Sequence, residues 1–122
     1  MIIIDNVKKA YTDEVKIGPL NIKIPKAGLT SLIGPNGAGK STTLLMIGRL
    51  LNMDEGQIKV ASLNVSESKS DNLAKILTIL RQENHFVTRL TVRQLVGFGR
   101  FPYSKGRLNK EDEAIISKYI DF

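Results

Sequence analysis

Residues 29–51 read Leu-Thr-Ser-Leu-Ile-Gly-Pro-Asn-Gly-Ala-Gly-Lys-Ser-Thr-Thr-Leu-Leu-Met-Ile-Gly-Arg-Leu-Leu. The stretch opens with a mostly apolar run over 29–33 and continues as a glycine-rich loop over 34–39. From Lys40 to Leu51 apolar residues recur at helical spacing. This order predicts a buried strand, then a loop, then a helix that begins near Lys40.

The loop over 34–41 fits the phosphate-binding pattern G-x-x-x-x-G-K-[ST] in full. Its glycines permit backbone conformations that other residues avoid, so the N–H groups can turn inward around a phosphate chain. The helix that follows directs its positive end to the same point. Lys40 can reach the β- and γ-phosphates, and Ser41 can offer its hydroxyl to Mg²⁺. The residues expected to bind ATP are Gly34, Pro35, Asn36, Gly37, Ala38, Gly39, Lys40, Ser41 and Thr42.

The rest of the chain shows alternating strand and helix patterns. Alternation of apolar and polar residues over 15–24 predicts an antiparallel strand with one face in water. Thr91 and Asn109 are expected N-caps, and acids follow Asn109 in the first turn, where the helix dipole favours them. The other expected elements are strands over 2–4, 57–60 and 76–80, and helices over 70–75 (with Ser70 and Asp71 as its caps), 92–98 and from 110 to the C-terminus.

The composition is that of a globular domain. Of the 122 residues, 42% are hydrophobic and 25% are charged. There is no cysteine, which excludes disulfides, zinc knuckles and thiol catalysis. No apolar run is long enough to cross a bilayer, and the start Met1-Ile2-Ile3-Ile4-Asp5 lacks the basic region of a signal peptide. A cytoplasmic protein is therefore expected.

The formal net charge of +6 is concentrated in one part of the chain. Between Arg81 and Lys110 there are seven basic residues and one acid. Such a stretch suits anionic lipid, nucleic acid or an acidic partner, and it equally suits a basic surface in contact with water.

The wording Gly-Pro-Asn-Gly-Ala-Gly-Lys-Ser-Thr over 34–42 resembles the ATP-binding subunits of ABC transporters. Tyr11 lies shortly after the first strand, where similar ATPases stack an aromatic ring on adenine; a tyrosine packed on a strand edge is the alternative. Gln82 follows the apolar run 76–80 and looks like the family's Q-loop glutamine. The resemblance implies that Gln82 is the catalytic residue of this chain and that Ser41 and Gln82 hold the Mg²⁺.

The segment from Leu90 to Tyr103 contains the sequence Gly-Arg-Phe-Pro-Tyr and is similar to the corresponding segment of the iron-siderophore and haem importers within that family. In such proteins the region after the Q-loop, here Asn84 to Phe86, meets the membrane subunits. The implied architecture is α/β, a partial ABC ATPase domain. It comprises an antiparallel β region over 1–28 and 56–65, a P-loop NTPase-like core over 29–55 and 76–82, and the start of a helical subdomain over 84–122.

The resemblance implies a chain that binds ATP and Mg²⁺ as the N-terminal part of an importer's ATPase. The implied partners are membrane permease subunits and a second ATPase subunit at the inner face of the cell membrane, with neither nucleic acid nor direct membrane insertion. The family's Leu-Ser-Gly-Gly-Gln signature and Walker B acids do not occur in these 122 residues, so hydrolysis by this chain alone is not expected. The alternatives are a piece of a soluble ABC ATPase that acts on nucleic acid, and a non-catalytic interaction module for a permease.

Overall fold

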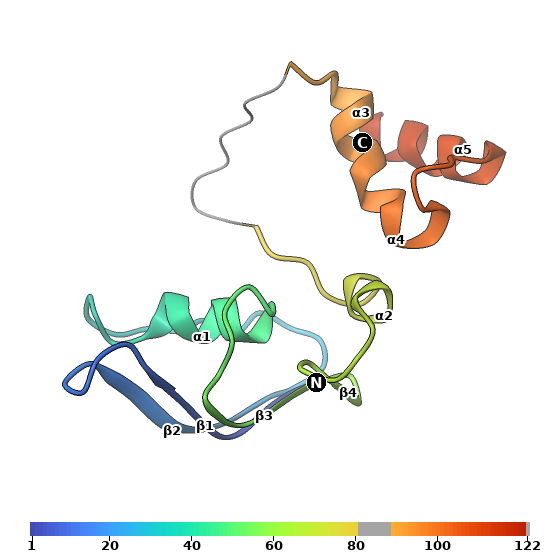
Figure 1. The fold of residues 1–122 in the computed structure, drawn as a ribbon. Helices are drawn as coiled ribbons and strands as arrows, with labels where there is room; N and C mark the ends of the chain where they lie inside the picture. The colour runs from blue at the N-terminus through green and yellow to red at the C-terminus, as the bar shows by residue number, and fades with distance from the viewer. Residues whose placement is uncertain (81–88, 122) are drawn as a thin grey trace. The chain divides into compact units, whose positions relative to one another are not determined.

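The computed structural model describes residues 1–80 and 89–121. The chain divides into two compact units, Met1–Thr78 and Ile79–Phe122. In the first unit a sheet is covered by helices, and in the second short helices pack together (Figure 1). The elements of the first unit are β1 (Ile2–Ala10), β2 (Lys16–Ile24), α1 (Lys40–Ile47), β3 (Glu55–Val60), β4 (Leu63–Asn64) and α2 (Ser70–Ala74).

The sheet has the strand order β2-β1-β3-β4, and each neighbouring pair is antiparallel. Ile4 of β1 lies opposite Ile22 of β2 and Ile58 of β3, so one face of the sheet carries a row of isoleucines. Such cross-strand apolar pairs stabilise a sheet. The predicted antiparallel strands are confirmed. Strand β1 is longer than the apolar run 2–4 that predicted it, and it ends at Ala10.

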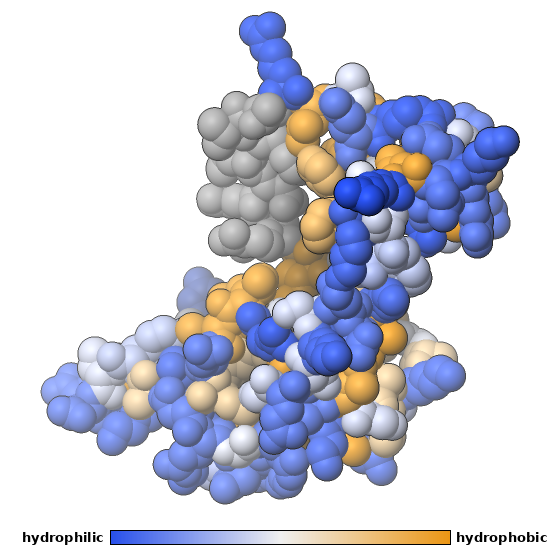
Figure 2. All heavy atoms as spheres, turned by 45° about the vertical axis from the view of Figure 1, so that its right-hand side comes forward, coloured by the Kyte–Doolittle hydropathy of each residue, from blue (hydrophilic) through white to orange (hydrophobic). Residues whose placement is uncertain are grey.

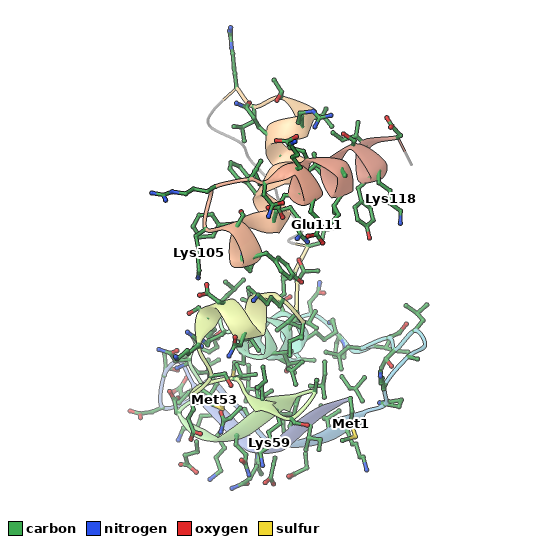
Figure 3. All side chains as sticks on the ribbon, turned by 90° about the vertical axis from the view of Figure 1, so that its right-hand side faces the viewer. Met1, Met53, Lys59, Lys105, Glu111 and Lys118 are labelled. Atoms are coloured by element: carbon green, nitrogen blue, oxygen red, sulfur yellow. The ribbon has the colours of Figure 1, made fainter. Side chains whose placement is uncertain are left out.

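The core of the first unit lies between this sheet and α1, which crosses one face of it (Figure 1). Ile4 and Val7 of β1 and Ile58 of β3 pack against Met46 of α1, and these four side chains are almost fully buried. Lys59, between two buried residues of β3, is exposed on the opposite face of the sheet (Figure 3). The alternation therefore fixes which face of the sheet supports α1.

Two predicted strands are not present. Residues 29–33 and 76–80 are not in a strand, and neither run joins the sheet of the described residues. Ile33 and Leu80 are each 90% exposed. An apolar run shows that a segment can be buried, but a buried strand also needs neighbours that bond its edges and cover its faces. No other strand in the described part of the chain lies beside these segments. The side chains of 29–33 are exposed, as are other apolar side chains in Figure 2, whereas Leu77 of the second run is partly buried against the core.

The helix α2 has the predicted place but not the predicted caps. Its N-cap is Lys69, and no side chain bonds to the helix start. The Ser70 hydroxyl instead accepts a hydrogen bond of 2.8 Å from Arg49. Arg49 also donates to the backbone carbonyl of Ser68 at 2.6 Å, so this guanidinium ties the end of α1 to the start of α2.

The second unit contains α3 (Val92–Gly97), the 3₁₀ turn η1 (Phe98–Arg100), α4 (Phe101–Ser104) and α5 (Lys110–Ile120). The predicted caps are confirmed. Thr91 and Gln94 form a capping box at α3, and Asn109 and Asp112 form one at α5. Glu111 lies in the first turn of α5 and Lys118 in its last, an arrangement that complements the helix dipole (Figure 3).

Charged side chains join the helices of this unit. Arg93 of α3 donates to Glu113 at 2.8 Å and to Ser117 at 2.9 Å, both on α5. The buried Asp112 accepts from Arg100 at 2.7 Å, and the Arg100 guanidinium lies 4.2 Å from the centre of the Tyr103 ring. Two arginines of the basic stretch are therefore engaged inside the unit.

Among the described residues, no helix is both long and apolar enough to cross a membrane.

Candidate nucleotide-binding site

The start of α1 has no side-chain cap. Gly39 is its N-cap, no side chain accepts a bond from the first turn, and that turn contains no acid. The first N–H groups of a helix have no acceptor within the helix. The amides of Lys40, Ser41 and Thr42 therefore point out of the helix end, toward the loop, together with the positive end of the helix dipole.

Glycine is required at the junction of the loop and α1. Gly37 and Gly39 have φ angles of 84° and 82°, in the left-handed region that disfavours side chains. At Gly39 an added Cβ would also lie 3.0 Å from two carbon atoms of Ile17, a β2 side chain. The second strand therefore presses against the loop and helps to set the course of the backbone into α1.

Lys40 bends back over the loop that precedes it. Its ammonium donates to the carbonyl oxygens of Gly34 and Pro35, each at 2.7 Å. The Pro35 carbonyl also accepts from the Ala38 amide at 3.3 Å, which closes a turn inside the loop. A full positive charge thus lies across the mouth of the loop, where a phosphate would also meet the amides of the helix start. The donor set fits a phosphate chain.

Tyr11 and the P-loop helix are brought together, although 31 residues separate Tyr11 from Thr42 in sequence. The Tyr11 hydroxyl lies 3.0 Å from the Thr42 hydroxyl. Tyr11 is 51% exposed, so about half of the residue remains accessible beside the helix start. This placement suits a ring that stacks on a base next to the phosphate loop.

Some of the remaining predicted site residues are exposed near the start of α1, and the others lie outside the described residues. Ser41 is exposed in the first turn of α1, where its hydroxyl is available to a Mg²⁺ ion bound with the phosphates. Asn36 is exposed in the loop. Gln82, and the segment from Asn84 to Phe86, lie outside the described residues.

Three supporting residues were missed by the sequence analysis. Thr43 is buried, and its hydroxyl and amide both donate to the Gly39 carbonyl at 2.9 Å. Ile17 contacts the loop, and Asp54 bonds to the backbone just before Tyr11. Thr43 follows the motif directly and could have been suspected as a helix-start bond, but no sequence signal shows that residues 17 and 54 reach the site.

The second unit contains a hollow of about 450 Å³ beside α3. Phe98, Phe101 and Leu108 line it, and its one arginine, Arg93, already bonds Glu113. Its chemistry suits apolar groups and not a triphosphate. The phosphate-binding chemistry of the described residues is therefore concentrated in the first unit.

The sequence profile of the ABC transporter family matches residues 17–121. This chain belongs to the ABC transporter family. It is 87% identical over its whole length to the petrobactin import ATP-binding protein FatE of Bacillus anthracis, of which it covers 49%. It is 43% identical over its whole length to the petrobactin import ATP-binding protein YclP of Bacillus subtilis, of which it covers 48%. The chain thus spans about half the length of the curated relatives it matches.

Solved structures of ABC transporter cassettes share this fold. The dimeric structure of MJ0796, a bacterial ABC transporter cassette, matches with a TM-score of 0.77 and 26% identity over 99% of this chain and 55% of that one. A post-hydrolysis state of the same cassette, bound to ADP and Pi, matches with a TM-score of 0.76. The predicted fold class, a partial ABC ATPase domain, is confirmed, as is the resemblance to siderophore importers.

Proposed function

We propose that this chain binds ATP with Mg²⁺ through the P-loop, as part of the ATP-binding subunit of an importer for iron-siderophore complexes. The observation that carries the proposal is the uncapped start of α1 with the Lys40 ammonium beside it. The amides of a helix start together with one ammonium suit a triphosphate. The siderophore class rests on relatives that are named as petrobactin import ATP-binding proteins.

The same relatives support the assignment of partners. An ATP-binding protein of an importer works with membrane permease subunits, and the MJ0796 cassette, which has a similar fold, forms a dimer. We infer that this sequence operates at the inner face of the cell membrane with a permease and a second ATPase subunit. The Arg93–Glu113 and Arg100–Asp112 pairs bind part of the basic stretch within the chain, which argues against a nucleic-acid surface.

Hydrolysis is not proposed for this chain on its own. Turnover needs a group that polarises the attacking water and a clamp on the γ-phosphate. The signature and Walker B residues that resemblance assigns to those tasks are not in the sequence. Purified chain with Mg²⁺ and ATP should release no phosphate above the level of a Lys40→Ala variant.

The binding proposal is tested by calorimetric titration of the chain with ATP, with and without Mg²⁺. Lys40→Ala removes one charge-assisted contact to phosphate, which is worth ~1.5–3 kcal/mol, so affinity should fall roughly ten- to a hundredfold. Lys59→Ala is the matched control because Lys59 is exposed on the sheet face away from α1. Equal affinity in the Lys40→Ala and unaltered chains would refute the proposal.

A further inference from the structure

One carboxylate ties the loop after α1 to the end of β1. Asp54 accepts from the Ala10 amide at 2.8 Å and from the Lys9 ammonium at 2.7 Å. Its own amide donates to the Lys8 carbonyl at 2.9 Å. Three consecutive residues of β1 are therefore held by a single residue that lies 44 positions beyond Ala10.

The end of β1, which Asp54 holds, is followed directly by Tyr11. The Tyr11 amide donates to the Val15 carbonyl at 2.9 Å, and the Thr12 hydroxyl accepts from the Val15 amide at 3.0 Å. These bonds close the turn between β1 and β2. The aromatic residue is thus the first residue of a tight turn, and the residue before it is fixed by Asp54.

Residues from both ends of α1 contact Tyr11 or the backbone just before it. At the start of α1, Thr42 contacts the phenol oxygen of Tyr11. Beyond the end of α1, Asp54 bonds the backbone that precedes the ring. Gly56 allows this close approach, because a Cβ there would collide with the Asn6 carbonyl of β1.

The charge on Asp54 is favoured by the same bonds. The Ala10 amide, and then the Lys9 ammonium, hold the pKa of the Asp54 carboxyl below its ordinary value of 3.8. Asp54 is therefore ionised at neutral pH and accepts both bonds with a full negative charge, which strengthens them.

We propose that Asp54 is a positioning residue for nucleotide recognition, which fixes the turn that presents Tyr11 to the base of the bound nucleotide. The inference rests on the proposed function and extends it to a residue outside the P-loop. Asp54 contacts no phosphate site; it acts through Ala10 and Tyr11. Its effect should therefore appear in the part of the binding that depends on the base, and not in the part that depends on the phosphates.

The test compares affinities for Mg-ATP and for inorganic tripolyphosphate, which has the phosphates without the base. Stacking of a base on an aromatic ring is worth enough that Tyr11→Ala should weaken ATP binding roughly tenfold and leave tripolyphosphate binding unchanged. Asp54→Ala should weaken ATP binding by roughly three- to tenfold, also with tripolyphosphate unchanged. The double variant should bind ATP no more weakly than Tyr11→Ala alone.

Glu55→Ala is the matched control. It removes the acid next to Asp54, at the start of β3, and Glu55 pairs with Lys8 at 2.6 Å instead of with the backbone before Tyr11. It should leave both affinities unchanged. The inference is overturned if Asp54→Ala weakens both ligands equally, if it weakens neither, or if its effect adds in full to that of Tyr11→Ala.

Amide hydrogen exchange of residues 10–15 without ligand gives a second readout. Asp54→Ala should speed exchange of the Ala10 and Tyr11 amides, and Glu55→Ala should not. If the unaltered chain binds neither ATP nor tripolyphosphate, the proposed function fails and the role in nucleotide recognition fails with it. Unchanged exchange in Asp54→Ala, with ATP binding intact in the unaltered chain, would overturn the positioning role alone.

Discussion

The helices α1 and α5 begin in opposite ways. At α5 the Asn109 side chain accepts from the Asp112 amide at 2.9 Å, the Asp112 carboxylate accepts from the Asn109 amide at 3.1 Å, and three acids occupy the first turn. At α1 the N-cap is a glycine, and neither a side-chain cap nor an acid is present. One helix start is closed by its own side chains and the other is open.

The capped start of α5 stabilises the fold, whereas the uncapped start of α1 leaves amides for a ligand. A capping box satisfies helix amides and stabilises the fold. An open start leaves those amides to a ligand and gives up that stabilisation, which is typical of a site where local rules are broken for function. Lys40 supports the proposed anion site at the open end, because its ammonium lies there without an acid beside it in the first turn.

Closing the open start should produce the largest effect. Ser41→Asp places an acid in the first turn of α1, where it should stabilise the helix of the ligand-free chain by ~0.3–1 kcal/mol. The same charge should repel the phosphates and lower ATP affinity by roughly a hundredfold or more. Thermal unfolding and calorimetric titration measure the two effects. Ser41→Ala, which removes the hydroxyl without adding charge, should lose far less affinity.

Retained ATP affinity in Ser41→Asp would show that phosphates do not bind at the start of α1. Loss of stability in Ser41→Asp would contradict the expected stabilisation of the ligand-free helix, whatever happens to the affinity.

Opening the closed start should have a smaller effect. Asn109→Ala removes the cap of α5 and should destabilise that helix by ~1 kcal/mol. Amide exchange across residues 110–120 at neutral pH should rise by roughly fivefold, with exchange in α1 unchanged. Asn109→Asp is the control, since aspartate caps as well as asparagine does. Unchanged exchange in Asn109→Ala would mean that packing against α3 holds α5 without its cap.

The smallest expected effect is a loss of α5 stability at low pH, which we attribute to Asp112. The Asn109 amide, and then Arg100, hold the pKa of this carboxyl below its ordinary value of 3.8. Because the folded pKa is lower than the unfolded one, the stability that Asp112 contributes is present above about pH 3.8 and is lost as the pH falls through the folded pKa.

Protection of the α5 amides should therefore decline below about pH 3.8, and Asp112→Asn should start less protected and show a flatter decline. Glu111→Gln controls for the loss of an exposed carboxylate from the same turn. Parallel decline in the unaltered chain and in Asp112→Asn would assign the acid sensitivity to other groups.

Local signals in the sequence predicted most local structure, although the predicted caps of α2 were wrong. The caps Thr91 and Asn109, the helix after Lys40 and the antiparallel strands all follow from residues within a few positions of each element. The runs 29–33 and 76–80 failed as strands because strand formation depends on a neighbour, and an apolar run does not say where its neighbour is.

The candidate site was predicted to the same extent. The motif gave the residues that are expected to surround a phosphate, and resemblance gave Tyr11, whose hydroxyl lies 3.0 Å from that of Thr42. The contribution of Asp54 could not be predicted, because an acid in the sequence Asp-Glu-Gly has the same local pattern whether or not it reaches another strand. The roles of the site residues remain predictions that the titrations above decide.

The exposed side chain of Ile33 has a consequence for the loop that follows it. Ile33 is joined to Gly34, whose carbonyl holds the Lys40 ammonium, so the loop is anchored by α1 at one end and by an uncovered segment at the other. Under the proposed function, phosphate binding carries an entropic cost if the backbone that enters the loop loses freedom when the anion binds. Any surface that covers Ile33 would remove part of that cost beforehand, and would tighten nucleotide binding without touching the nucleotide.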